Sequence, residues 1–139
     1  MAKKILIVDD EPDSVSFISS ILEDNGYDSI SSRTGVGGME LARKEKPDLI
    51  LLDLIMPEKG GIRMFQELKR DTRLSRIPVI VVTGMSRITG VDFRNVIRKQ
   101  EGEAGEESSD TILGTPDGFV EKPVDPSELV KAIEDILEE

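Results

Sequence analysis

The stretch PDLILLD at residues 47–53 decides the fold that the sequence predicts. Its centre, Leu49 to Leu52, is an unbroken aliphatic run, and continuous apolar runs are typical of strands buried on both faces of a sheet. Strand-like segments recur at four other places, the last two being weaker: Ile5 to Val8, Val79 to Val82, 27–31 and 118–121. We therefore expect five strands, most of them fully buried.

Segments with helical spacing of apolar residues lie between these strands. The first includes Val15 to Leu22 and stops at Asn25-Gly26, which is a good helix stop signal. The last has Asp125 as an N-cap, with Pro126 and Glu128 at favoured positions of the first turn. Three shorter amphipathic stretches stand at 39–42, 64–68 and 91–97. This alternation predicts an α/β fold, a doubly wound parallel sheet with helices on both faces.

The composition excludes several kinds of chemistry. The chain has 139 residues and a net charge of -10, with no histidine and no cysteine. Disulfides, thiolate or Ser-His catalysis and zinc held by sulfur or imidazole are therefore excluded. The acidic excess, with no local basic patch standing out, argues against binding to nucleic acid or to a membrane surface. The four-residue apolar run near the amino terminus is too short for a signal peptide, so we expect a cytoplasmic protein.

Acidic and polar residues stand at the ends of the predicted strands. Asp9-Asp10, Asp53 and Thr83 end three of them, and Lys122 follows the fifth. In such sheets the ligand site lies at the carboxyl ends of the strands, so these residues should gather at one edge. Three neighbouring carboxylates need a counter-charge to stay ionised, and an all-oxygen ligand set selects Mg²⁺. The sequence predicts a Mg²⁺ site there.

Each of these residues also has an ordinary interpretation. A strand-terminal aspartate is more often a helix cap or a turn residue than a metal ligand. Thr83 could simply end a strand, Lys122 could be a solvated charge, and Phe119 could be an ordinary core residue. Only their combination, in this order along the chain, favours a chemical role.

Four segments carry a resemblance to a known family: ILIVDDE at 5–11, PDLILLDLIMPEKGG at 47–61, PVIVVTG at 78–84 and FVEKP at 119–123. They resemble the receiver domains of two-component response regulators, from Lys3 to about Leu137, with an interruption after Thr83. The resemblance implies a flavodoxin-like sheet of order 2-1-3-4-5 and one receiver domain over residues 1–139. It also implies a cis peptide bond between Lys122 and Pro123.

The resemblance implies a phosphorylation site. Asp53 would be the phosphoacceptor, and Asp9 and Asp10 would hold Mg²⁺ together with Asp53 and the backbone carbonyl of Ile55. Lys122 and the Thr83 hydroxyl would each contact a phosphoryl oxygen. The protein would be a regulatory phosphoacceptor and not an enzyme, except that it assists its own phosphorylation and dephosphorylation.

The resemblance also implies a switch and a set of partners. Thr83 would move toward the phosphorylated Asp53, and Phe119 would turn inward. The phosphoryl donor would be a histidine kinase, a histidine phosphotransfer protein or a small acyl phosphate. We expect no effector domain beyond Glu139, so a stand-alone receiver would act on a downstream protein target, with homodimerisation left open.

Two alternatives stay open. A pseudo-receiver would keep the fold and bind a partner without phosphorylation, although the intact set of acidic residues, Thr83 and Lys122 argues against it. A phosphatase with an aspartyl-phosphate intermediate needs an acidic residue two positions after the nucleophile, and this chain has Ile55 there.

Two departures from the common family pattern are informative. Ile55 and Met85 are apolar at positions expected to flank the phosphoryl group, so our hypothesis is that they slow its hydrolysis. Between Thr83 and Phe119 lie 35 residues, more than the roughly 16 to 24 that one helix and two loops need. The excess predicts an acidic insertion around 100–116, whose core is 101–110. A solvated loop is the favoured interpretation, and a recognition arm for a basic partner is the alternative.

Overall fold

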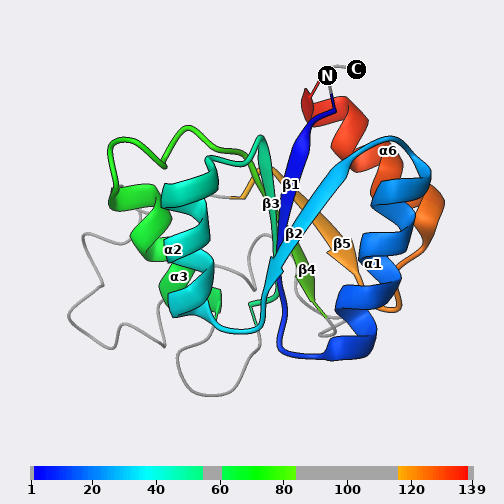
Figure 1. The fold of residues 1–139 in the computed structure, drawn as a ribbon, viewed down its shortest axis with the longest axis horizontal. Coiled ribbons are helices and arrows are strands. Elements are labelled where there is room, and N and C mark those ends of the chain that lie inside the picture. The colour runs from blue at the N-terminus through cyan, green and yellow to red at the C-terminus, as the bar shows by residue number, and fades with distance from the viewer. Residues whose placement is uncertain (1, 55–60, 84–115, 138–139) are drawn as a thin grey trace.

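The computed structural model describes residues 2–54, 61–83 and 116–137, which form a parallel sheet between two helical layers (Figure 1). The strands are β1 (Lys4–Val8), β2 (Asp28–Ser32), β3 (Leu49–Leu52), β4 (Val79–Thr83) and β5 (Gly118–Glu121). The helices are α1 (Pro12–Asp24), α2 (Gly35–Glu45), α3 (Gly61–Arg70) and α6 (Pro126–Leu137). The strand order is β2-β1-β3-β4-β5 and every pair is parallel, which confirms the predicted flavodoxin-like topology.

The continuous apolar strands serve two separate cores. In β1, Leu6 and Val8 pack in the core beneath α2 and α3, whereas Ile5 and Ile7 pack in the core beneath α1 and α6. Successive side chains of a strand point to opposite faces, so a strand covered on both faces must be apolar at every position. Burial on both faces is the physical reason for the continuous apolar runs in the sequence.

The expected helix signals are present at both ends of the chain. After α1, the Asn25 amide donates to the Leu22 carbonyl at 3.0 Å, and Gly26 adopts a left-handed φ of 85°. Before α6, the Asp125 carbonyl accepts the first helical hydrogen bond, from the Leu129 amide at 3.0 Å. The helix expected near 91–97 and the acidic insertion around 100–116 lie outside the described residues.

The topology brings particular strand ends together. The strands run in one direction, so their carboxyl ends share the edge that is lowest in Figure 1. Strands β1 and β3 are neighbours, with Val8 paired to Leu52. The residues that follow these two positions, Asp9 and Asp53, are therefore placed side by side.

Within residues 2–54, 61–83 and 116–137, none of the helices has both the length and the apolar character needed to cross a bilayer.

Candidate functional site

Two buried carboxylates form the centre of the site. Asp9 and Asp53 are only 2 % and 4 % exposed. The sheet ladder continues up to both of them: the Asp53 amide donates to the Val8 carbonyl at 3.0 Å, and the Asp9 amide donates to the Ser32 carbonyl at 3.1 Å. Buried carboxylates are costly unless they are paired, so the site requires a cation.

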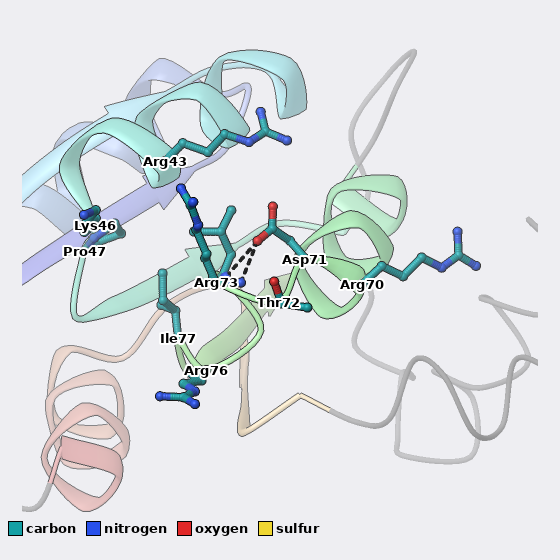
Figure 2. Close-up of a pocket in the computed structure, with 10 residues that line it drawn as sticks. Arg43, Lys46, Pro47, Arg70, Asp71, Thr72, Arg73, Arg76 and Ile77 are labelled. Atoms are coloured by element: carbon teal, nitrogen blue, oxygen red, sulfur yellow. Dashed lines mark hydrogen bonds between the residues drawn. The ribbon is translucent and has the colours of Figure 1, made fainter.

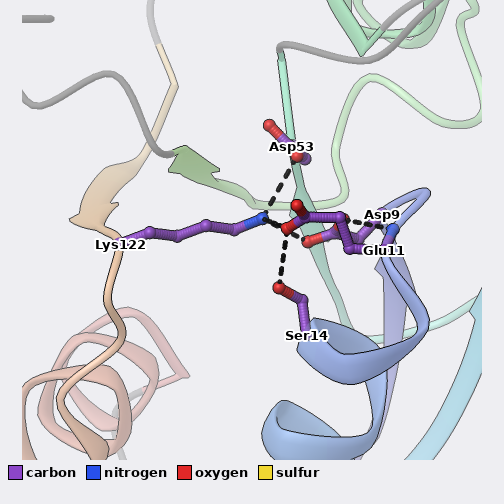
Figure 3. Close-up of polar contacts among 5 residues, drawn as sticks. All are labelled: Asp9, Glu11, Ser14, Asp53 and Lys122. Carbon is purple, nitrogen blue, oxygen red and sulfur yellow. Dashed lines mark hydrogen bonds and ion pairs between the residues drawn. The ribbon is translucent and has the colours of Figure 1, made fainter.

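Lys122 supplies that positive charge. Its side chain, 14 % exposed, extends from the end of β5 into the acidic cluster (Figure 3). Its Nζ donates to Asp9 Oδ2 at 2.8 Å, to Glu11 Oε1 at 3.2 Å and to Asp53 Oδ2 at 3.3 Å. The interpretation of Lys122 as a solvated surface charge is therefore wrong. The expected cis bond between Lys122 and Pro123 is present.

The electrostatics of Lys122 follow from these contacts. Burial opposes its charged form, but the hydrogen bond to Asp9 and the charges of Asp53 and Asp9 outweigh this effect and raise its pKa above the usual value. The ammonium is therefore charged at neutral pH, and the site has a permanent cation beside its carboxylates.

The acidic residues form a cluster that fits a metal ion. One carboxylate oxygen from each of Asp9, Asp10 and Asp53 lies within 4.8 Å of the other two, and Asp10 is half-buried. The donors are all anionic oxygens, which suit a hard divalent cation such as Mg²⁺. The predicted fourth ligand, the backbone carbonyl of Ile55, lies outside the described residues.

Glu11 is a fourth carboxylate of the site, and no role was predicted for it from the sequence. It occupies the N-cap position of α1, yet its side chain makes no capping hydrogen bond. Its Oε1 instead accepts from Lys122 and, at 3.1 Å, from Ser14 Oγ. These two hydrogen bonds, that of Lys122 first, lower the pKa of Glu11. Its place directly after the Asp9-Asp10 pair was the signal that could have identified it.

Gly61 is a second residue of the site that sequence reasoning missed. It begins α3, and its backbone lies against that of Asp53 and Leu54. A Cβ at this position would overlap the carbonyl oxygen of Asp53 and would lie 2.8 Å from the Asp53 carbonyl carbon and 2.9 Å from Leu54 Cα. Only glycine permits this close approach, so Gly61 sets where α3 packs relative to Asp53.

The remaining predicted residues are less fully defined. Thr83 ends β4 beside Glu121 of β5, but its side chain lies outside the described residues, as do Ile55 and Met85. Phe119 lies beside Val81 and is 39 % exposed, so its interpretation as an ordinary core residue is wrong. The structure thus brings together Asp9, Asp10, Asp53 and Lys122.

Comparison with known proteins agrees with this geometry. A family model described as the response regulator receiver domain matches residues 5–92. Protein PilH of Pseudomonas aeruginosa is 32 % identical over 137 residues, which cover 96 % of this chain and 97 % of that protein. The polar-differentiation response regulator DivK of Brucella anthropi is 38 % identical over 86 residues, covering 62 % of this chain and 70 % of that protein.

A solved structure extends the comparison to three dimensions. The signal receiver domain of a signal transduction histidine kinase from Syntrophus aciditrophicus is 32 % identical and superposes with a TM-score of 0.76. The match covers 99 % of this chain and 91 % of that one. Sequence and fold therefore agree over almost the whole chain. The chain belongs to the response regulator receiver domain family and has a role in two-component signalling.

Proposed function

We propose that this chain is a phosphoacceptor of a two-component phosphorelay, with Asp53 as the acceptor and Mg²⁺ as the required ion. The observation that carries the proposal is the contact of 3.3 Å between Lys122 Nζ and the buried Asp53 carboxylate, next to Asp9 and Asp10. The donor would be a phosphohistidine of a histidine kinase or phosphotransfer protein.

The reaction requires little covalent chemistry from the protein. An Asp53 carboxylate oxygen attacks the phosphorus atom, and the bond from phosphorus to the donor's histidine nitrogen breaks. Phosphoryl transfer depends mainly on alignment and on neutralising the charge of the phosphoryl oxygens. Lys122 provides one positive charge at the acceptor. A Mg²⁺ ion held by Asp9, Asp10 and Asp53 would neutralise further charge on the phosphoryl group.

The output would be a conformational switch read by a downstream protein. Phosphorylated Asp53 would carry about 1.5 to 2 negative charges, by analogy with other phosphorylated residues, in place of the single charge of its carboxylate. Thr83 and Phe119 belong to the neighbouring strands β4 and β5, whose pairing runs from Ile80 and Gly118 to Thr83 and Glu121. We propose that Thr83 moves toward the phosphoryl group and that Phe119, now partly exposed, becomes buried. A local charge change would thereby bias a two-state element.

The test is incubation with acetyl phosphate, with Mg²⁺ or with EDTA, followed by intact-mass measurement. We expect one phosphoryl adduct per chain in the incubation with Mg²⁺ and no adduct in the incubation with EDTA. Catalytic consumption of acetyl phosphate without a lasting adduct would indicate a phosphatase instead. No adduct and no consumption would indicate a pseudo-receiver, and either result would contradict the proposal.

Lys122→Met replaces the ammonium with an uncharged side chain. It should destabilise the protein and increase the stabilisation that Mg²⁺ provides. Breaking a buried ion pair costs about 3–5 kcal/mol, and the partial exposure of this site lowers our expectation to about 2–4 kcal/mol without metal. Mg²⁺ should then raise the melting temperature of the variant more than that of wild type, because the ion no longer competes with the ammonium.

Lys131→Met is the matched control, since Lys131 is exposed on α6 and its ion pair with Asp135 is long, at 3.9 Å. This control should leave both the stability and the Mg²⁺ response close to those of wild type. Equal Mg²⁺ shifts in wild type and Lys122→Met would show that the metal and Lys122 do not share the same carboxylates.

A further inference from the structure

A basic pocket lies on the opposite edge of the sheet from the acidic cluster. It is formed by the carboxyl end of α2, by Pro47 just before β3, and by the loop between α3 and β4, and its volume is about 820 Å³ (Figure 2). Pro47 and Asp53 are six residues apart along one extended strand, which corresponds to about 20 Å. The pocket is therefore separate from the proposed phosphorylation site.

The pocket concentrates positive charge in a chain whose net charge is -10. Five cations line it, against a single carboxylate: Arg43, Lys46, Arg70, Arg73 and Arg76. None of the five forms an ion pair with a residue that the structure describes. The expectation that the protein has no basic patch is therefore wrong. Two short segments that are separate in the sequence are brought together by the packing of α2 beside α3.

The single carboxylate of the pocket is already engaged by the backbone. Asp71 Oδ1 accepts hydrogen bonds from the amide of Arg73 at 2.8 Å and from that of Leu74 at 3.1 Å. These bonds, that of Leu74 first, lower the pKa of Asp71 and keep it ionised. The Asp71 carbonyl also accepts from the Ser75 amide at 2.8 Å. Asp71 thus fixes the loop that bears Arg73 and Arg76.

The pocket combines these cations with an apolar floor. Pro47 and Leu74 are buried and Ile77 is half-buried. Arg73 extends from the loop toward the end of α2, where Arg43 and Lys46 lie, whereas Arg70 and Arg76 point outward (Figure 2). Arginine recognises phosphate through paired N–H donors, and pockets of about 300–1,000 Å³ suit small organic ligands.

We propose that this pocket binds a small organic polyphosphate of the nucleoside diphosphate class. Its phosphates would be held between Arg43 and Arg73, and its base would lie on the floor formed by Pro47 and Leu74. The cations come from two sides of the pocket, so two linked phosphates reach more of them than a single phosphate can. An acidic peptide would match the charge but would leave the apolar floor unused.

The test is calorimetric titration with ADP at about 0.15 M salt, where long-range attraction is screened beyond about 8 Å. Mg²⁺ is omitted so that the nucleotide is not drawn to the acidic cluster. We expect saturable 1:1 binding, weakened at least about tenfold by the double variant Arg43→Gln/Arg73→Gln, because each substitution removes a charge-assisted hydrogen-bonding partner of the phosphates.

The matched control is Arg33→Gln/Arg63→Gln, which removes the same charge from exposed positions outside the pocket. It should leave the affinity within about twofold, since distant exposed charges are screened. Asp53→Asn should also bind ADP normally, so failure of this proposal is distinguishable from failure of the proposed function.

Several outcomes would overturn the inference. Absence of saturable binding would do so, as would equal weakening by the pocket and control pairs, which would indicate only a diffuse field. If tripolyphosphate bound as tightly as ADP, the apolar floor of the pocket would have no role in holding the base. A glutamate-rich peptide binding more tightly than ADP would make the pocket a protein-docking surface.

Discussion

Asp53→Asn is expected to reduce the phosphoryl adduct formed with acetyl phosphate and Mg²⁺ below detection. The amide keeps the shape of the side chain and an oxygen that accepts from Lys122, but it is not an effective nucleophile. The fold should persist, because the substitution removes one of several like charges gathered at the site. Intact-mass measurement checks the loss of the adduct in the variant, and peptide mapping of the wild-type adduct checks its position.

The control for this change is Asp135→Asn, an exposed aspartate on α6. Its adduct should form at the wild-type rate. An adduct that still forms in Asp53→Asn would show that the acceptor is another carboxylate. The neighbouring Asp9 and Asp10 would be the first positions to test.

Gly61→Ala should have the second large effect, on both stability and phosphorylation. The added methyl group would overlap the carbonyl group of Asp53, and backbone atoms cannot rotate away as a side chain can. Overpacking of this kind costs about 1–3 kcal/mol, occasionally more. Relief of the overlap must shift α3 or the residue that we propose as acceptor. We expect a lower free energy of unfolding in urea and slower adduct formation.

Gly118→Ala on β5 is the matched control. Among the described residues, the atoms nearest to its Cβ would be side-chain atoms, Ile80 Cγ1 at 3.4 Å and Ile136 Cδ1 at 3.5 Å, which can adjust. The control should lose less stability and should keep its rate of phosphorylation. If Gly61→Ala is as stable and as active as Gly118→Ala, the close approach of α3 does not position Asp53.

The strands that are buried on both faces were the most predictable part of the fold. The expected limits of β3, Leu49–Leu52, coincide with the observed ones, because every residue there is apolar and buried. The edge strand β2 was placed one residue too early, since Tyr27 is buried but precedes the strand. Its own sequence, DSISS, is mostly polar and gives only a weak pattern.

Within the candidate site, residues that end strands were predictable and residues defined by packing were not. Asp9, Asp10, Asp53 and Lys122 each stand next to a strand end, and the parallel topology is sufficient to gather them. The role of Gly61 depends on how closely α3 approaches β3. The basic pocket likewise depends on α2 packing beside the loop after α3, a proximity that the linear order of charges does not reveal.

The hydrogen bonds of Lys122 also limit how the site can change state. A lysine ammonium has three N–H donors, and Asp9, Glu11 and Asp53 together supply three acceptors. A phosphoryl oxygen can gain a full bond to Lys122 only if one carboxylate gives up its own. Glu11, whose side chain is 64 % exposed, loses least, because water can replace its partner. Modification of Asp53 would thus be an exchange of hydrogen-bond partners at Lys122, and the displaced carboxylate lies at the N-cap of α1.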